Sequence, residues 1–220
     1  MRTGESTEIQ EPDFGTYHHT TPRGSKQLRE RVRALFAQAF DYLPFPRNAR
    51  LKILDMGCGL GFLSCLCAEY YPSAMVTGFD TFDHASLKGS SLAKAKENAR
   101  ILRFDERIEF QKRDFLRSDY SEEKFDLFVS NLVFENLGKR RLKAYERLAK
   151  WTTSTSYAVL SEVFFDYATD FKKLTSLFGM VHERPGSLIA SRSRGRRLVY
   201  KMLVLSKPRK KPSIRDATRA

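Results

Sequence analysis

One short glycine-rich stretch combines residue types at a spacing that could do chemistry. Asp55 is followed by Gly57, Gly59 and Gly61 in the run DMGCGLG, directly after the apolar residues LKIL. Glycine-rich turns after a strand let a ligand approach the backbone, often at a helix N-terminus. An acidic residue at the head of the turn would repel a phosphate but could pair with a cationic ligand.

Two phosphate-binding motifs are excluded by the residues themselves. The dinucleotide fingerprint requires Gly-x-Gly-x-x-Gly, but counting from Gly57 the sixth position is Phe62. The phosphate-binding loop of NTPases ends in Gly-Lys-Ser/Thr, and the glycine-rich stretch has no such ending. The pattern that remains is Asp-x-Gly-x-Gly-x-Gly, whose acidic residue favours a cationic or ammonium-bearing ligand.

Three later polar residues extend this pattern. Asp80 ends the segment VTGFD, 25 residues after Asp55, Asp114 lies in KRDF, and Asn131 ends FDLFVSN. Taken in order with DMGCGLG, these residues resemble the motifs of class I S-adenosylmethionine-dependent methyltransferases. The resemblance covers roughly residues 45–206.

The resemblance implies S-adenosyl-L-methionine as the cofactor and a role for each motif residue. In that family the glycine turn lies near the amino-acid portion of the cofactor, and the acid at Asp80 accepts hydrogen bonds from both ribose hydroxyls. Asp114 would contact the adenine amino group, with Phe115 against the ring, and Asn131 would lie next to the transferred methyl. The implied cofactor-binding residues are Asp55, Gly57, Gly59, Gly61, Asp80, Asp114, Phe115 and Asn131.

Three of these residues also have purely structural alternatives. Asp80 could cap the turn that follows it. Asp114, flanked by Arg113 and Arg117, could belong to a surface ion pair. Asn131 could satisfy only loop backbone groups.

Methyl transfer from a sulfonium is an in-line displacement, so alignment and a water-poor pocket are the main requirements. It needs no metal, and it needs a base only when the nucleophile must lose a proton early. The candidate catalytic residues are Asn131, Glu135 and His18, with Tyr17 and His19 beside His18 in GTYHH. The alternative for Glu135 is an exposed acid that leads the next helix.

The segment after the fourth strand also bears on the acceptor. Family members that methylate base amino groups usually carry Asn/Asp/Ser-Pro-Pro-Tyr/Phe here, whereas this chain has Ser-Asn-Leu-Val-Phe without a proline. This counts against adenine or cytosine amino groups, although Phe134 could still stack on a planar substrate. Cytosine C5 methylation would need a cysteine here, but Cys58, Cys65 and Cys67 all lie near the glycine turn.

The charge balance favours a polyanionic partner. The chain has 39 Lys and Arg against 26 Asp and Glu, a net charge of +13, and residues 184–211 contain ten basic and no acidic residues. We therefore expect RNA or another macromolecule as the acceptor. A small-molecule acceptor, a protein side chain and an inactive cofactor-binding partner subunit remain alternatives. The expected RNA contacts are Arg192, Arg194, Arg196, Arg197 and the basic run 207–211.

Alternating strand and helix patterns must position these residues. After a helical pattern over 25–42, with Ser25 as its expected N-cap, strands and helices alternate up to residue 178. Two further strands then follow without a helix between them, so they must pair antiparallel. The sequence predicts an α/β, Rossmann-like, mainly parallel seven-stranded sheet with an antiparallel C-terminal hairpin and helices on both faces. Strands are expected at 51–56, 74–80, 107–114, 124–131, 156–163, 179–184 and 197–206, and later helices at 62–71, 86–104, 139–151 and 167–178.

Three segments follow from this pattern. Residues 1–45 form an N-terminal arm and helix that could cap the site, 46–206 form the cofactor-binding methyltransferase domain, and 207–220 form a basic tail expected to be disordered. No apolar run is long enough to span a membrane, and the three clustered cysteines are expected to be buried hydrophobic residues with no metal site. A cytoplasmic location is expected, and the oligomeric state is left open.

Overall fold

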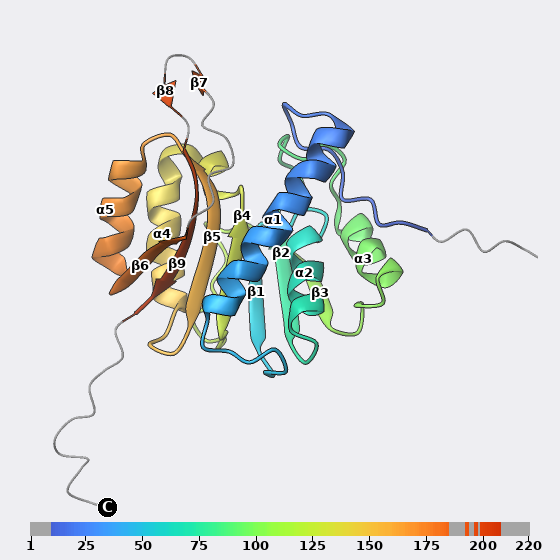
Figure 1. Ribbon diagram of the computed structural model, residues 1–220, viewed down its shortest axis with the longest axis horizontal. Helices are drawn as coiled ribbons and strands as arrows, with labels where there is room; N and C mark the ends of the chain where they lie inside the picture. Colours follow the sequence, from blue (N-terminus) through green and yellow to red (C-terminus); the bar gives the residue numbers. More distant parts are fainter. Residues whose placement is uncertain (1–9, 185–191, 194–195, 198, 208–220) are drawn as a thin grey trace, which may run out of the picture.

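A seven-stranded sheet forms the centre of the computed structural model, which describes residues 10–184, 192–193, 196–197 and 199–207 (Figure 1). The strand order is β3-β2-β1-β4-β5-β9-β6, and β7 and β8 form a separate two-stranded ribbon. The strands are β1 Lys52–Met56, β2 Met75–Asp80, β3 Ile108–Lys112, β4 Leu127–Asn131, β5 Tyr157–Phe164, β6 Met180–Arg184, β7 Arg192–Ser193, β8 Arg196–Arg197 and β9 Val199–Ser206.

The pairing of the strands confirms the predicted fold class. Strands β1 to β5 are paired parallel, whereas β9 is antiparallel to both β5 and β6. The predicted C-terminal hairpin is therefore present, because β6 and β9 are paired antiparallel. Within it, β9 lies between β5 and β6, so β6 becomes the edge of the sheet.

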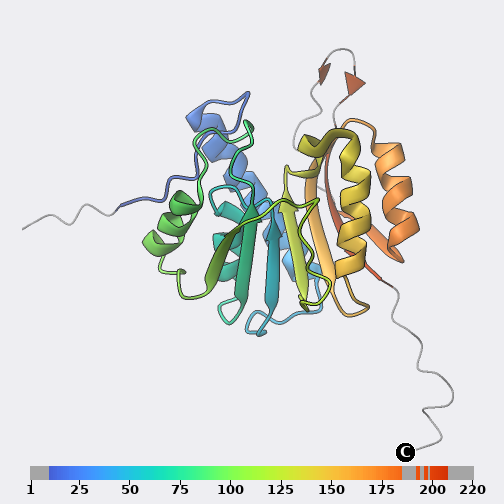
Figure 2. The same ribbon diagram turned by 180° about the vertical axis from the view of Figure 1, so that it is seen from behind.

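Helices cover both faces of the sheet, as predicted (Figures 1 and 2). The side chains of Ile53 and Leu54 point to opposite faces, because successive residues of a strand alternate. Ile53 joins the apolar cluster under the first three helices, and Leu54 joins the cluster under the last two. The helices are α1 Pro22–Tyr42, α2 Phe62–Tyr70 and α3 Leu92–Ile101 on one face, and α4 Arg141–Trp151 and α5 Tyr167–Leu177 on the other, preceded by the 3₁₀ helix η1 Phe134–Arg140.

Seen from behind, strands β1 to β3 have no helix over them (Figure 2). The connection 113–126 between β3 and β4 contains no helix and crosses this face. Its buried rings Phe115, Tyr120 and Phe125 belong to the apolar cluster of α4 and α5. This side of the sheet is therefore covered by aromatic side chains of a loop.

The predicted start of the first helix was wrong. The helix begins at Pro22, and its N-cap is Thr21, whose Oγ1 accepts a hydrogen bond from Gly24 N at 3.1 Å. Threonine before proline suits a helix start, because proline at the first helical position needs no backbone donor. Ser25 is buried and its Oγ accepts from Tyr17 N at 3.0 Å, so it holds the arm instead.

Two other expectations can be checked directly. The third helix is shorter than predicted, since it begins after the cap Ser91 and residues 81–90 form turns and a bridge. The three cysteines are free and buried, as predicted. No helix within the described ranges is long and apolar enough to cross a membrane. The tail beyond residue 207, like Arg194, lies outside the described residues.

Candidate active site

The glycine turn connects β1 to α2 and is tied to β2. The backbone N–H groups of Gly57 and Cys58 both donate to Phe79 O, at 2.8 and 2.9 Å. Gly57 has φ +76°, and a Cβ atom there would lie 2.5 Å from Val133 Cγ2. Gly59 has φ +53°, in the same left-handed region. These positions require glycine because a side chain would strain the turn and collide with its neighbours.

Asp55 lies inside the protein behind this turn. Its side chain is 1% exposed, and Ser64 Oγ on α2 donates to its Oδ2 at 2.5 Å. Burial raises the pKa of Asp55 to about 7, with the hydrogen bond from Ser64 opposing the shift. Ser64 was missed in the sequence, where a serine among the apolar residues of FLSCLC was the available signal.

Asp80 joins two turns at the end of β2. Its Oδ2 accepts from Gly59 N at 3.0 Å, and its Oδ1 accepts from Phe82 N at 2.7 Å. The structural alternative, that Asp80 caps the turn after β2, is therefore also present, because its carboxylate accepts from Phe82 N in that turn. Each oxygen keeps a further lone pair for a ligand.

Asp114 and Phe115 begin the connection after β3. Asp114 Oδ1 accepts from Leu116 N at 2.8 Å, and its Oδ2 lies 3.6 Å from Arg117 Nε in an exposed ion pair. The surface ion pair considered as an alternative is thus present. Phe115 is 5% exposed and packs against Phe134 with ring centroids 5.3 Å apart. Its ring belongs mainly to the core.

Asn131 ends β4 and faces a buried hydroxyl group. Tyr200 on β9 donates from its hydroxyl to Asn131 Oδ1 at 3.3 Å and is hydrogen-bonded to Ser161 on β5. Burial raises the pKa of Tyr200 above its ordinary value. Sequence reasoning missed Tyr200, because its partner lies 69 residues away in the chain.

Two glutamates meet beyond Asn131. Glu135 is half-buried, its Oε2 accepts from Val163 N at 2.9 Å, and burial raises its pKa to about 7. The alternative of an exposed helix-leading acid is therefore wrong. Glu162 is 1% exposed and accepts hydrogen bonds from Ser130 Oγ, Val133 N and Phe134 N, at 3.0, 2.9 and 3.1 Å. Its only sequence signal is an acid within the apolar strand AVLSEVFF.

The arm before α1 is fastened to the rest of the site by Asn98 on α3. Asn98 Oδ1 accepts from Asp13 N at 2.9 Å, while its Nδ2 donates to Asp13 O at 2.8 Å and to Leu60 O at 2.9 Å. One side chain thus joins the arm to the glycine turn. His18 N donates to Ser86 O at 2.9 Å, and the exposed His18 ring lies beside the same carbonyl.

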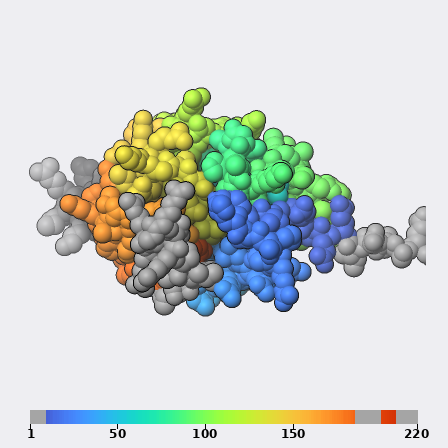
Figure 3. All heavy atoms as spheres, turned by 90° about the horizontal axis from the view of Figure 1, so that it is seen from above, coloured from blue at the N-terminus to red at the C-terminus, as the bar shows by residue number. Residues whose placement is uncertain are grey.

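A cavity of about 690 Å³ brings these groups together. Its size suits a small ligand or cofactor. Figure 3 looks onto this end of the molecule, where the blue N-terminal segment adjoins the green segments. Of the predicted site residues, Gly61 alone does not line the cavity. Those that do are His18, Asp55, Gly57, Gly59, Asp80, Asp114, Phe115, Asn131 and Glu135.

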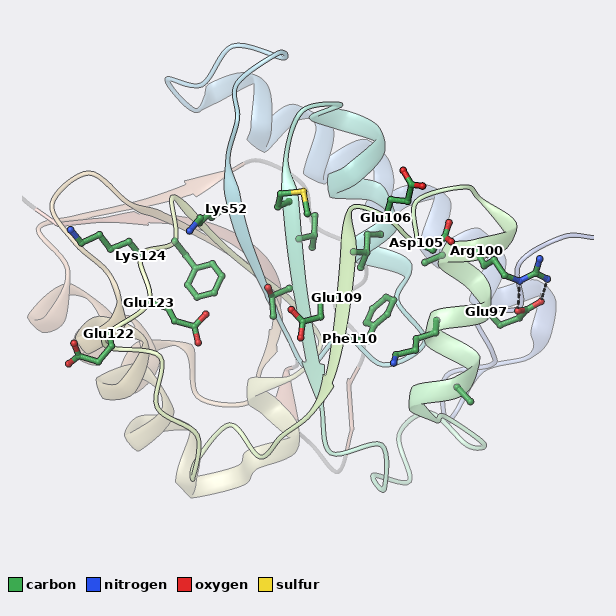
Figure 4. A pocket seen from close by; sticks show the side chains of 18 residues that line it. Lys52, Glu97, Arg100, Asp105, Glu106, Glu109, Phe110, Glu122, Glu123 and Lys124 are labelled. Atoms are coloured by element: carbon green, nitrogen blue, oxygen red, sulfur yellow. Dashed lines mark hydrogen bonds and ion pairs between the residues drawn. The ribbon is translucent and has the colours of Figure 1, made fainter.

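A larger hollow of about 1060 Å³ lies elsewhere, around the edge strand β3 (Figure 4). None of the predicted site residues lines it. Its charged side chains come from both sides of β3 and include Glu109 and Lys124, and Glu97 is paired with Arg100. We therefore take the smaller cavity as the candidate active site.

A family model and several curated proteins match this chain. A family model described as "Methyltransferase domain" matches residues 47–204. A tRNA1(Val) (adenine(37)-N6)-methyltransferase of Vibrio campbellii is 27% identical over 115 residues, 52% of this chain and 44% of the relative. A malonyl-[acyl-carrier protein] O-methyltransferase of Acetivibrio thermocellus is 29% identical over 142 residues, 61% of this chain and 46% of the relative. The chain thus spans about half the length of these curated relatives.

Two solved structures share the fold. The [4+2]-cyclase SpnF superimposes with a TM-score of 0.62 at 14% identity, covering 88% of this chain and 87% of its own. The plantazolicin methyltransferase BpumL, solved in complex with SAH, gives a TM-score of 0.56 at 15% identity and covers 83% and 86%. At this identity the likeness concerns the arrangement of helices and strands alone.

Proposed function

Because the chain belongs to the family of methyltransferase domains, we propose that it transfers a methyl group from S-adenosyl-L-methionine to RNA. The membership confirms the class I methyltransferase family and the cofactor expected from DMGCGLG. The observation that carries the RNA acceptor is that the basic ribbon β7–β8 stands at the same end of the molecule as the start of α1 (Figure 1).

The residues around the cavity suit this cofactor. Asp55, Asp80 and Asp114 line it, and the glycine turn offers no lysine for a phosphate. A ligand with an ammonium group and a ribose diol fits three carboxylates, whereas a pyrophosphate does not. Asp80 would hold the ribose hydroxyls, and the turn with Asp55 would hold the amino-acid portion. When bound, the cofactor supplies a methyl group activated by a positively charged sulfur.

The remaining cavity residues would prepare the acceptor. Asn131 and Glu135 line the cavity at the end of β4, where a side-chain amide can orient a nucleophile and a carboxylate can take its proton. Because burial raises the pKa of Glu135 to about 7, this carboxylate would accept a proton near neutral pH. The arm residues Tyr17 and His18 also line the cavity and would exclude water from it.

The ribbon β7–β8 favours RNA as the acceptor. It includes Arg192, Arg196 and Arg197, and it stands above the same end of the molecule as the start of α1 and the arm (Figure 1). Arginines placed beside an active site can position a phosphate backbone without reading its sequence. The similarity to a tRNA methyltransferase agrees with this acceptor. Ser-Asn-Leu-Val-Phe lacks the proline pair, which counts against a base amino group as the methyl acceptor, although the similar tRNA enzyme is named for adenine N6.

A small-molecule acceptor is the second candidate, because the arm closes part of the cavity. Asn98 fastens the arm through two hydrogen bonds to Asp13 and bonds the glycine turn through a third, and Tyr17 is half-buried. An inactive partner subunit is less favoured, since the acidic residues expected to bind the cofactor all line the cavity. We also propose a cytoplasmic location, because three free buried thiols suit a reducing compartment.

The acceptor can be tested with methyl-labelled cofactor and total cellular RNA. Label that becomes acid-soluble after nuclease treatment supports RNA, whereas label that nuclease does not release contradicts it. Removal of residues 207–220 should weaken RNA binding and flatten its dependence on salt, because phosphate contacts release counterions. Transfer into a protein-free, RNA-free metabolite extract would support the second candidate instead.

A further inference from the structure

The turn after β4 contains a backbone conformation that is unfavourable for its residue. Leu132 has φ +58°, in the left-handed region that leucine rarely adopts. It lies directly after Asn131 and three residues before Glu135, and all three line the cavity. Strained residues persist only where the surrounding structure holds them, and they are concentrated at functional sites.

Neighbouring groups hold this turn on both sides. Leu132 N donates to Ser161 O at 2.8 Å, and Asn136 Nδ2 donates to Leu132 O at 2.8 Å. Glu162 reaches across from β5 to residues before and after Leu132. Its Oε1 accepts from Ser130 Oγ at 3.0 Å, and its Oε2 accepts from Val133 N at 2.9 Å and from Phe134 N at 3.1 Å.

A carboxylate is well suited to this position. Burial, together with the neighbouring Glu135, raises the pKa of Glu162, and the hydrogen bonds from Val133, Ser130 and Phe134 oppose this shift. In the ionised form both oxygens only accept, so one group can satisfy a hydroxyl and two backbone donors at once. Glutamine would place an NH₂ group against at least one of these donors. Glu135 bonds back to the same strand, since its Oε2 accepts from Val163 N at 2.9 Å. Strand β5 thus holds the turn before and after Leu132.

We propose that Glu162 is a positioning residue for methyl transfer, which holds Leu132 in its left-handed conformation and thereby directs Asn131 and Glu135 into the cavity. This inference rests on the proposed function, because it assigns Glu162 a role in that reaction. Glu162 itself does not line the cavity and would not touch the cofactor or the acceptor.

The test compares Glu162→Gln, Leu132→Gly and the double variant, using methyl-labelled cofactor and total RNA. We expect Glu162→Gln to lower kcat by roughly 10- to 100-fold, because small displacements of reacting groups are costly. Cofactor affinity by calorimetry should change by less than about twofold, since the Asp80 contacts stay intact. Adding Leu132→Gly should recover about tenfold of the lost kcat, because glycine adopts the turn without help.

The matched control is Glu183→Gln. Glu183 is an exposed acid on β6 that bonds Tyr167 and Lys201 and does not line the cavity. Its loss should leave kcat unchanged. If Glu162→Gln instead lowers cofactor affinity and melting temperature together, and Leu132→Gly recovers nothing, Glu162 has only a structural role and the inference is overturned.

Amide hydrogen exchange separates this inference from the proposed function. In Glu162→Gln the amides of Val133 and Phe134 should exchange at least about tenfold faster than in the wild type, because their acceptor is impaired. Unchanged exchange, or faster exchange with an unchanged kcat, overturns the inference. If the wild type transfers no methyl group to RNA, the proposed function fails, while the exchange rates still decide whether Glu162 holds the turn.

Discussion

Asp80 Oδ2 accepts a hydrogen bond from the Gly59 backbone N–H at 3.0 Å, which ties the end of β2 to the glycine turn after β1. The second oxygen of the same carboxylate accepts from Phe82 N at 2.7 Å. One side chain therefore fixes two turns at the cavity and can still accept from a ligand. Removing the Asp80 side chain should therefore weaken ligand binding in two ways, because the turns lose their link and the ligand loses a hydrogen-bond acceptor.

Replacing Asp80 with alanine should weaken cofactor binding by about 1.5 to 3 kcal/mol, because two charge-assisted hydrogen bonds to the ribose are lost. Calorimetric titration with the cofactor measures this change. Asp105→Ala is the matched control, because Asp105 is an exposed acid that lines the other hollow. Equal affinities of Asp80→Ala and wild type would contradict the assignment of the ribose contact.

Gly57→Ala should destabilise the protein by about 2 kcal/mol or more, because the new Cβ would lie 2.5 Å from Val133 Cγ2 at φ +76°. Gly89→Ala separates the collision from the backbone strain. Gly89 also has a positive φ, +74°, but the nearest atom to a Cβ there is Lys94 Nζ at 3.6 Å, so about 1 kcal/mol is expected. Urea denaturation measures both, and similar losses would argue against the collision.

The stability of the protein should fall as the pH rises through the range where Asp55 titrates. Burial raises the pKa of Asp55 from 3.8 to about 7, so the folded state holds a proton that the unfolded state has lost. This contribution is fully present below pH 4 and is lost as the pH rises through 7. Urea unfolding of wild type should lose about 2 to 4 kcal/mol more than Asp55→Asn between pH 4 and 8.

Glu135 titrates in the same range, since burial raises its pKa to about 7. A pH effect of Asp55 must therefore be judged from the difference between variant and wild type. Glu135→Gln should remove its own share of the pH dependence, and combining it with Asp55→Asn should flatten the curve most. If both single variants run parallel to wild type, these carboxylates are not the groups that titrate.

Loss of the Asn98 side chain should loosen the arm. Asn98→Ala removes three hydrogen bonds that join the arm to α3 and the glycine turn, at roughly 1 kcal/mol each. We expect proteolytic cleavage within residues 10–20 to become faster and the cofactor to dissociate several-fold faster. Asn48→Ala, at an exposed loop position, should change neither rate. Unchanged cleavage of Asn98→Ala would show that other contacts hold the arm.

The sequence predicts best those features that depend on neighbouring residues. Apolar runs located all seven strands of the sheet, and DMGCGLG located the turn, because strand patterning and glycine spacing are local properties. The helix start at Thr21 was missed, although it is also local, because Pro22 was assigned to the arm. Threonine followed by proline was the stronger signal for a helix start.

The residues that support the site could not be identified in this way. Asn98 lies 85 positions from Asp13, and Tyr200 lies 69 positions from Asn131. Each is an ordinary polar residue within its own element, and only the folded chain gives it a partner. Glu162 is similar. An acid within an apolar strand is unusual, but the sequence does not indicate which hydrogen-bond donors surround it.

The position of β9 also has a consequence for the order in which the protein can assemble. Among the strands that the structure describes, β9 comes last along the chain, yet it lies between β5 and β6, and β6 pairs with β9 alone. During synthesis, a chain that has grown past α5 leaves β5 with an open edge and β6 without a neighbour until residues 199–206 emerge. Open strand edges pair readily with other chains. The growing polypeptide is therefore most prone to aggregate in the interval between the synthesis of β6 and that of β9.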